Sequence, residues 1–220
     1  MALDGPIAMP TEMAVLTLAQ WFSPAYPIGS FAYSHGLEWA IETGNVHDSE
    51  TLGAWIGDVL EFGSGHNDAL FLTLAYQSDD PTGVNGMCRA FAPSKERLKE
   101  TDLQGAAFGE ITSAIWGHDF LPLAYPVAVG WAAKLTDLPL TLTSQMYLQS
   151  FASSLTSVGM RLIPLGQRKG HTLIQSFTPL CCTIAEQTAR GNLNDLSTTA
   201  FLPDIASMKH ETQYSKVFRT

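Results

Sequence analysis

Residues 48–63, DSETLGAWIGDVLEFG, decide the fold class, because their apolar side chains recur at helical spacing. The apolar positions lie at i, i+3, i+4, i+7 and i+8, and they are Leu52, Trp55, Ile56, Val59 and Leu60. This spacing places all five on one face of an α-helix. Asp48 or Ser49 is a suitable N-cap, and Gly63 is a suitable end. The stretch therefore predicts an amphipathic helix with one buried face.

The same periodicity recurs along the rest of the chain. It is found at Leu103, Ala107, Ile111 and Ala114, and again at Leu173, Phe177, Leu180 and Ile184. Pro179 is expected to kink or split the second of these helices. Further helices are predicted over 12–22, 31–43, 67–77, 123–135, 140–162 and 193–201, with a loop over 78–86. We find no sustained alternation typical of strands. The sequence predicts an all-α, single compact domain of about eight to ten helices.

Composition and charge narrow the class of protein. With 45% hydrophobic and 15% charged residues over 220 positions, the chain can bury a core and is not disordered. Its net charge of −9 disfavours binding to nucleic acid or to an anionic membrane. Residues 1–88 hold 11 acidic and no basic residues, whereas 12 basic and 10 acidic residues follow. This asymmetry indicates either opposed faces for different partners or, once folded, an evenly mixed surface.

Three cysteines, with no CxxC pair, indicate neither a zinc framework nor a disulfide scaffold. No apolar run approaches the roughly 20 residues of a membrane span, and the first residues lack the basic stretch of a signal peptide. We therefore expect a cytoplasmic protein that does not enter a membrane. A surface so poor in charge suits a protein that works in a complex.

The sequence contains no complete copy of the common catalytic motifs considered below. His210 and Glu211 begin like the zinc motif HExxH, but Tyr214 stands in place of the second histidine. The chain has no GxxxxGK[ST], GxGxxG or GxSxG motif, which removes the common nucleotide and acyl-transfer classes. We predict no catalytic residue and no metal ligand of the chain's own.

One alternative is a metal-dependent helical enzyme. His35, Glu38 and Glu42 stand at i, i+3 and i+7, so on a helix they would share one face and could contact a metal ion. The other interpretation is an ordinary solvated face opposite the apolar positions. A charged run at 95–100 is read in the same way as an exposed helix start, although its i, i+4 pairs are like-charged and repulsive.

Four stretches together resemble the UreF family of urease accessory proteins. They are SPAYPIGSFAYSHGLEWA at 23–40, KERLKETDLQG at 95–105, a segment from SFAS at 150–153 to RLIPLGQ at 161–167, and DIASMKHETQYSKVFR at 204–219. The matches keep their order and extend over nearly the whole chain. One departure is Lys216, where arginine is more usual, and lysine lacks the forked contact of arginine.

The resemblance implies an all-helical, non-enzymatic protein that takes part in nickel insertion. Such proteins form a dimer, bind the accessory protein UreD (UreH in some systems), and recruit the GTPase UreG to apo-urease. It implies no stably bound cofactor, since the complex handles the nickel. On this basis we predict the following partner-binding residues: Phe31, Tyr33, His35, Glu38, Arg161, Gln167, Met208, His210, Glu211, Tyr214, Lys216, Phe218 and Arg219.

The tail itself suits binding to a partner. Residues 205–220 mix apolar side chains with anchors such as Tyr214 and Arg219, which are residue types favoured at binding hot spots. We therefore expect a helical domain over 1–204, with 205–220 as a partner-binding tail that contributes little to the core and orders on binding. The alternative is a tail that packs on its own domain.

Overall fold

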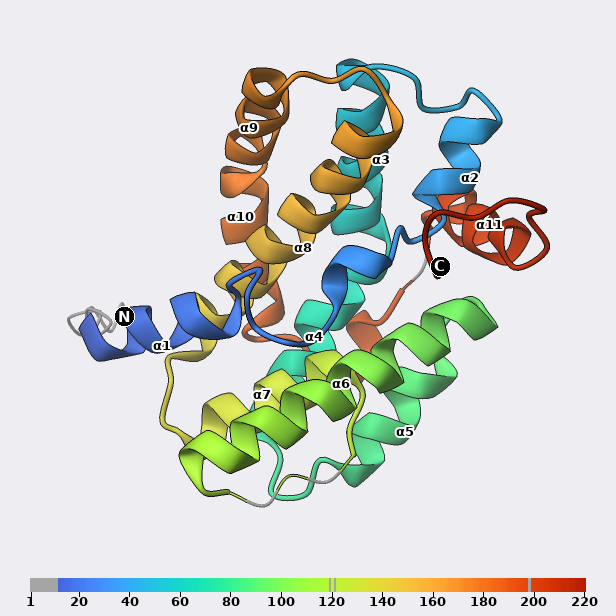
Figure 1. Ribbon diagram of the computed structural model, residues 1–220. Helices are drawn as coiled ribbons and strands as arrows, with labels where there is room; N and C mark the ends of the chain where they lie inside the picture. Colours follow the sequence, from blue (N-terminus) through green and yellow to red (C-terminus); the bar gives the residue numbers. More distant parts are fainter. Residues whose placement is uncertain (1–11, 119, 121, 198) are drawn as a thin grey trace, which may run out of the picture.

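The computed structural model describes residues 12–118, 120, 122–197 and 199–220, and every regular element among them is a helix (Figure 1). The all-α class and the single domain are confirmed. The α-helices are α1 (Glu12–Trp21), α2 (Leu37–Glu42), α3 (Ser49–Phe62), α4 (Ser64–Gln77), α5 (Thr82–Ala90), α6 (Lys95–Trp116), α7 (Tyr125–Leu135), α8 (Leu140–Leu162), α9 (Gln167–Ser176), α10 (Thr178–Thr188) and α11 (Phe201–His210). Two 3-10 helices, η1 (Ser30–Ala32) and η2 (Leu193–Asp195), complete them.

Helix α4 lies at the centre of the molecule. Its middle, from Ala69 to Thr73, is buried on all sides, as expected for a helix that other helices surround. Helices α3, α5, α7, α8 and α10 pack against it. Gly130 of α7 permits the closest approach, because a Cβ atom there would lie 2.1 Å from the carbonyl oxygen of Leu72.

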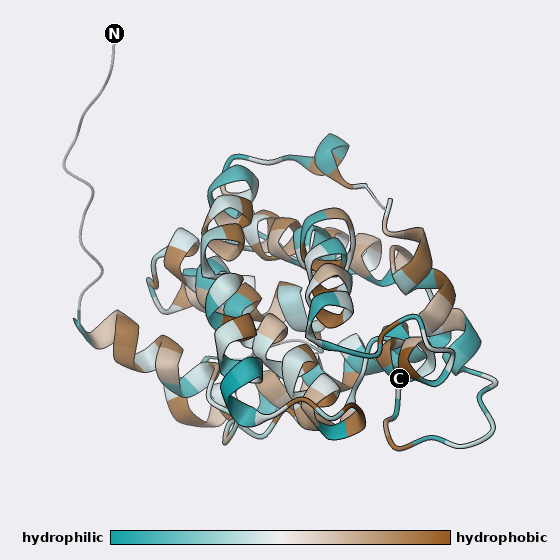
Figure 2. Ribbon diagram, turned by 90° about the horizontal axis from the view of Figure 1, so that it is seen from above, coloured by the Kyte–Doolittle hydropathy of each residue, from teal (hydrophilic) through white to brown (hydrophobic). Residues whose placement is uncertain are grey.

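The remaining helices form the flanks. The long helix α8 carries α9 and α10 on one side and α2 on another, while α6 packs on α7, and α11 contacts α2 and α6. Helix α1 projects from the body (Figures 1 and 2), and Figure 2 shows hydrophobic residues along this projecting helix. Within the described ranges, no helix combines the length and apolar character needed to cross a bilayer.

Most of the predicted helices are confirmed. Helix α8 occupies the predicted range 140–162, and α3 begins after Asp48, whose carboxylate accepts the Thr51 N–H at 2.9 Å. The predicted break near Pro179 is found as well, because α9 ends at Ser176 and α10 begins at Thr178. Counting α9, α10 and the six-residue α2 separately gives eleven α-helices in the described part of the chain.

The helix predicted over 31–43 is wrong in its first half. His35 and Gly36 have φ angles of 56° and 74°, which are left-handed and interrupt a right-handed helix. The segment therefore forms η1, a turn, and then the short α2. Gly36 is suited to this place because it has no Cβ, and a Cβ there would lie 2.5 Å from the Ser207 nitrogen of α11.

Two other segments differ from the prediction. The predicted loop 78–86 contains the start of α5, and just before the helix the Asp80 carboxylate accepts the Thr82 N–H at 2.9 Å in a local turn. Of the helix predicted over 193–201, the described residues form only the short η2 and the first residue of α11. Helix α11 begins where that prediction ends, and just before it the amides of Thr199 and Ala200 donate to the Phe62 carbonyl.

Candidate functional site

Four segments that are far apart in the sequence meet at one end of the molecule. They are the segment leading into α2, the start of α6, the end of α8, and the chain after α11 (Figure 1). The Nη1 atom of Arg97 lies 3.1 Å from Nδ1 of His35, whose ring centroid is 4.6 Å from that of Phe151. Arg161 donates to the carbonyl of Phe31 at 3.2 Å. These segments also carry the sequence resemblance.

Glu38 of α2 holds the tail by its backbone. Its carboxylate accepts the N–H of Val217 at 2.7 Å and the N–H of Phe218 at 2.9 Å. Both Glu38 and Phe218 are buried. A buried carboxylate is stable only if donors replace its lost water, and hydrogen bonds to a charged group are stronger than neutral ones. Glu38 is therefore an anchor for the tail.

His210, at the end of α11, lies between two carboxylates. Its Nε2 atom is 3.2 Å from Glu38, and its Nδ1 atom is 2.6 Å from Glu96. Each ring nitrogen therefore lies within hydrogen-bond distance of a different carboxylate. Lys216 donates to the other oxygen of Glu96 at 2.7 Å. We call Glu38, Glu96, His210 and Lys216 the C-terminal clamp, since together they join α2, α6, α11 and the tail.

The tail also completes the start of α6. Ser94 is the N-cap, and its hydroxyl oxygen accepts the Arg97 N–H at 3.1 Å. The Glu211 carboxylate accepts the Lys95 N–H at 2.7 Å, and the Ser207 hydroxyl lies 2.6 Å from that of Ser94. A negative charge at a helix N-terminus is favourable, because the first N–H groups have no partner inside the helix.

The last residues run alongside the loop that precedes α2. The Arg219 N–H donates to the Ala32 carbonyl at 2.8 Å, and the Ser34 N–H donates to the Thr220 carbonyl at 3.0 Å. The Ser34 hydroxyl donates to the same carbonyl, and the Thr220 hydroxyl donates to Glu100 at 2.9 Å. These bonds satisfy backbone groups that would otherwise be buried without partners.

A buried ion pair lies beneath this contact. Arg97 donates to Glu100 at 2.5 Å, and Gln104 donates to the other oxygen of Glu100 at 3.2 Å. Burial opposes the charge of Arg97, but Glu100 and Asp68 outweigh it and raise the pKa of Arg97. Burial, and then the charge of Arg97, lowers the pKa of His35 well below its ordinary value, so His35 is neutral and can accept from Arg97.

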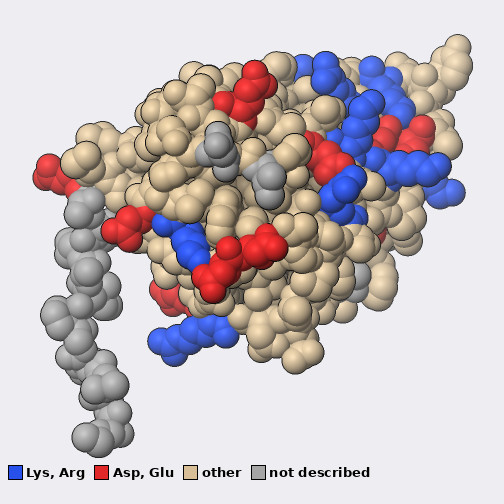
Figure 3. Space-filling model, turned by 90° about the horizontal axis from the view of Figure 1, so that it is seen from below, with Lys and Arg blue, Asp and Glu red and all other residues tan. Residues whose placement is uncertain are grey.

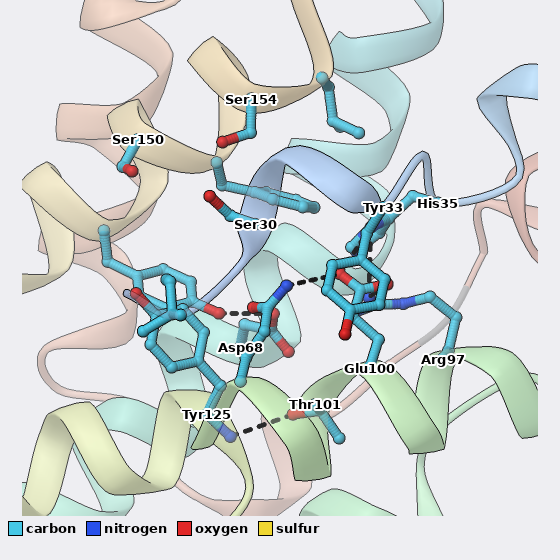
Figure 4. Close-up of a pocket in the computed structure, with 15 residues that line it drawn as sticks. Ser30, Tyr33, His35, Asp68, Arg97, Glu100, Thr101, Tyr125, Ser150 and Ser154 are labelled. Carbon is cyan, nitrogen blue, oxygen red and sulfur yellow. Dashed lines mark hydrogen bonds and ion pairs between the residues drawn. The ribbon is translucent and has the colours of Figure 1, made fainter. Parts of the chain in front are cut away.

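Figure 4 shows a small cavity on the inner side of this pair, lined by Asp68 and Tyr125 among others. Its volume of about 40 Å³ has room for about three water molecules. The Tyr147 hydroxyl donates to the Asp68 carboxylate at 2.9 Å, and the Tyr125 N–H donates to the Thr101 hydroxyl at 3.1 Å. Burial raises the pKa of Asp68 to about 6, although Arg97 and Tyr147 act in the opposite direction.

The raised pKa of Asp68 predicts a dependence of stability on pH. Because the folded-state pKa lies above the unfolded value of 3.8, the folded chain binds more protons between these values. The contribution of Asp68 is then full below about pH 4 and is lost as the pH rises through about 6, a change of at most about 3 kcal/mol.

The measurement is urea unfolding of the wild type and of Asp68→Asn across this pH range. The wild type is expected to lose stability relative to the variant as the pH rises. A difference that does not change with pH would contradict the assignment.

The predicted partner-binding residues divide by exposure. The exposed ones are Phe31, Arg161, Gln167, Met208, Tyr214, Lys216 and Arg219, while Glu211 is half-buried. The buried ones are Tyr33, His35, Glu38, His210 and Phe218. In this conformation Glu38 and His210 of the buried set hold the tail, His35 contacts Arg97 and Phe151 instead, and the exposed set is open to a partner. Gln167, at the start of α9, has no hydrogen bond to the tail among the described residues.

The expectation of a tail that contributes little to the core is wrong. Helix α11 continues to His210, whose side chain is fully buried, and Phe218 is only 3% exposed. The guanidinium of Arg161 lies 4.6 Å from the ring centroid of Phe218, a cation–π contact. Deleting 205–220 would uncover this buried surface, so point variants are the cleaner test of the tail.

The geometry assumed for a metal site on one helical face is also wrong. His35 precedes α2 with a left-handed φ, Glu38 is occupied by the tail, and Glu42 is exposed. No group of three His, Cys, Asp or Glu side chains is placed to hold a metal ion in the part of the chain that the structure describes.

Sequence reasoning missed Glu96, Arg97 and Glu100 as site residues. A signal was present, because the like-charged pair Glu96 and Glu100, one helical turn apart, is unfavourable on an isolated helix. The structure explains the pair, since each carboxylate has its own cations and donors: Glu96 binds His210 and Lys216, and Glu100 binds Arg97.

Comparison with known proteins identifies one family, with relatives that align over nearly the whole chain. The UreF family profile matches residues 46–178. The chain is 54% identical to the urease accessory protein UreF of Ruegeria pomeroyi over 217 residues, which cover 97% of this chain and 100% of that protein. It is 46% identical to the UreF of Roseobacter denitrificans, with 97% of each chain covered. It is 39% identical to the UreF of Rhodopseudomonas palustris, with 100% of this chain and 99% of that protein covered.

Proposed function

Since the chain belongs to the UreF family of urease accessory proteins, we propose that it is a scaffold in the assembly of the urease nickel centre. On this proposal it binds a UreD protein (UreH in some systems) and recruits the GTPase UreG to apo-urease. It acts as a homodimer in the cytoplasm. Nickel is the cargo of the complex, and this subunit is an accessory protein that binds no cofactor stably and catalyses no reaction.

This proposal rests on the conformation of the tail, which presents an exposed loop while both ends of the loop are bound to the domain. Tyr214 is fully exposed, at the tip of a loop that is held at both ends. His210 in the clamp fixes one end, and the bonds from Val217 and Phe218 to Glu38 fix the other. A loop whose two ends are fixed before binding loses little backbone conformational entropy when a partner covers the aromatic side chain at its tip.

The outer face of α11 extends the same surface. Four large apolar side chains on this helix are exposed, and they are Phe201, Leu202, Ile205 and Met208. The opposite face, with Ala206, Ser207 and His210, is buried against the domain. Exposed apolar side chains grouped on one element are typical of a protein–protein contact. They support an interface that includes α11 and the loop after it.

The absence of a phosphate-binding motif supports recruitment of a separate GTPase. A P-loop needs a glycine-rich stretch that ends in a lysine to hold the phosphates. This sequence contains no such GxxxxGK[ST] motif. On the proposal, UreG brings the nucleotide site, while this subunit contributes surfaces. UreG docks only after this subunit has formed its complex with the UreD protein.

Tyr214→Ala is expected to weaken binding to the purified UreD protein by about thirtyfold, which corresponds to about 2 kcal/mol for an interface tyrosine. The melting temperature is expected to stay the same, because the side chain contacts no part of the core. Ile115→Ala, at the opposite end of α6, is the control, since Ile115 is exposed as well. Titration calorimetry gives both affinities.

Two outcomes would contradict the proposal. One is an unchanged affinity of Tyr214→Ala for the UreD protein. The other is an equal loss of affinity in Ile115→Ala, which would place the interface elsewhere. Urease activation in cells is expected to fall with the Tyr214 variant and not with the control.

A further inference from the structure

The lysine and arginine side chains are unevenly placed on the folded protein. Residues 1–88 contain none. Figure 3 shows most of the basic side chains visible on that face gathered at one end of the molecule, where α6 begins. A hollow of about 260 Å³ lies at this end, between α6 and the tail. Its cations are Lys99, Lys216 and Arg219, and Leu103 forms an apolar part of its rim.

The neighbouring carboxylates are already engaged inside the protein. Glu96 binds His210 and Lys216, while Glu100 is buried against Arg97. Arg219 is exposed, and its guanidinium has no ion pair among the described residues. In the described residues, Lys99 has no ion pair. Glu96, which also lines the hollow, neutralises Lys216, so the charge left without an ion pair is that of Lys99 and Arg219.

Two lysines at the start of α6 occupy positions that are unfavourable for the isolated domain: Lys99, which lines the hollow, and Lys95, which does not. Lys95 is the first residue of α6, and Lys99 lies one turn later on the same exposed face. A cation near a helix N-terminus opposes the helix dipole, and like charges at i and i+4 repel. Together they add to the positive potential around the hollow. A negatively charged group in the hollow would relieve this repulsion.

We propose that this hollow receives a carboxylate side chain from an acidic segment of the UreD partner, between Lys99 and Arg219. The inference rests on the proposed function, and it names the chemistry of the contact. Leu103 is 44% exposed beside the hollow, which suits a protein segment with apolar neighbours. In an otherwise acidic chain, this end also attracts an acidic partner during approach.

Lys99→Glu in the full chain tests this contact with the purified UreD protein as the probe. Affinity is expected to fall by at least about tenfold, mainly through a slower association rate, because a rim charge steers the encounter. Lys99→Met, which keeps most of the aliphatic stem, is expected to show a smaller loss. The matched control is Lys169→Glu on α9, across the molecule from the tail (Figure 1), with an expected change within about twofold.

Salt dependence and stability complete the test. Wild-type association is expected to slow steeply as salt is added, and that of Lys99→Glu only weakly. The melting temperature of Lys99→Glu is expected to stay the same or to rise. If Lys99→Glu and Lys169→Glu bind alike while Tyr214→Ala binds weakly, the carboxylate contact is wrong and the proposed function stands. If neither Lys99→Glu nor Tyr214→Ala weakens binding, the proposed function is wrong as well.

Discussion

Gly36→Ala is expected to lower the free energy of unfolding by about 3 kcal/mol or more. Two effects add: a left-handed backbone costs a non-glycine residue about 1–2 kcal/mol, and overpacking costs about 1–3 kcal/mol. The φ angle of Gly36 is 74°, and its Cβ would lie 2.5 Å from the Ser207 nitrogen and 2.7 Å from the Ala206 carbonyl carbon. Both neighbours are backbone atoms of α11, so the helix itself must move away from α2.

Gly44→Ala is the matched control for this prediction. Gly44 has a φ of 79°, but nothing lies within 4 Å of its expected Cβ. It therefore carries the backbone strain without the clash, and a loss of about 1–2 kcal/mol is expected. Urea unfolding of both variants separates the two effects. Equal losses in the two variants would show that the contact between α2 and α11 contributes nothing.

Glu38→Gln is expected to release the tail. The change keeps the size of the side chain but removes the charge that accepts the N–H groups of Val217 and Phe218 and lies 3.2 Å from Nε2 of His210. Removing one partner from a buried charged network costs about 3–5 kcal/mol. The Val217 and Phe218 amides are expected to lose most of their protection from hydrogen exchange. Mass spectrometry of peptides from the tail measures this.

The control for Glu38→Gln is Glu42→Gln. Both residues belong to α2, but Glu42 is exposed. The same chemical change there is expected to leave stability and exchange within experimental error. If Glu38→Gln also keeps the exchange rates of the wild type, the clamp does not hold the tail.

The sequence predicted the elements whose structure depends on near neighbours. The apolar stripe of α3 and the range of α8 required only residues within a few turns. The helix predicted over 31–43 was wrong because Gly36 meets α11, which lies far along the chain. Periodicity contains no information about such a contact. The apolar residues after 204 indicated binding, but they could not show that α11 buries its inner face against α2.

The candidate site was predicted in part for the same reason. Tyr214 and Arg219 could be recognised by residue type, and both are exposed. Glu96 was missed because its partner His210 is 114 positions away. Glu38 was noticed, but as part of a helical face, whereas its donors come from the tail. Buried polar networks of this kind join distant segments, so they are visible only once the fold is known.

The central claim is that the UreD partner recognises the tail in its docked form. The most direct test is the affinity of Glu38→Gln for the purified UreD protein, beside Glu42→Gln. Glu38 is buried, so its replacement changes no exposed side chain of the tail. The account predicts a loss of affinity of at least about tenfold for Glu38→Gln and no change for Glu42→Gln. Full affinity of Glu38→Gln, with a tail shown by hydrogen exchange to be released, would contradict the claim.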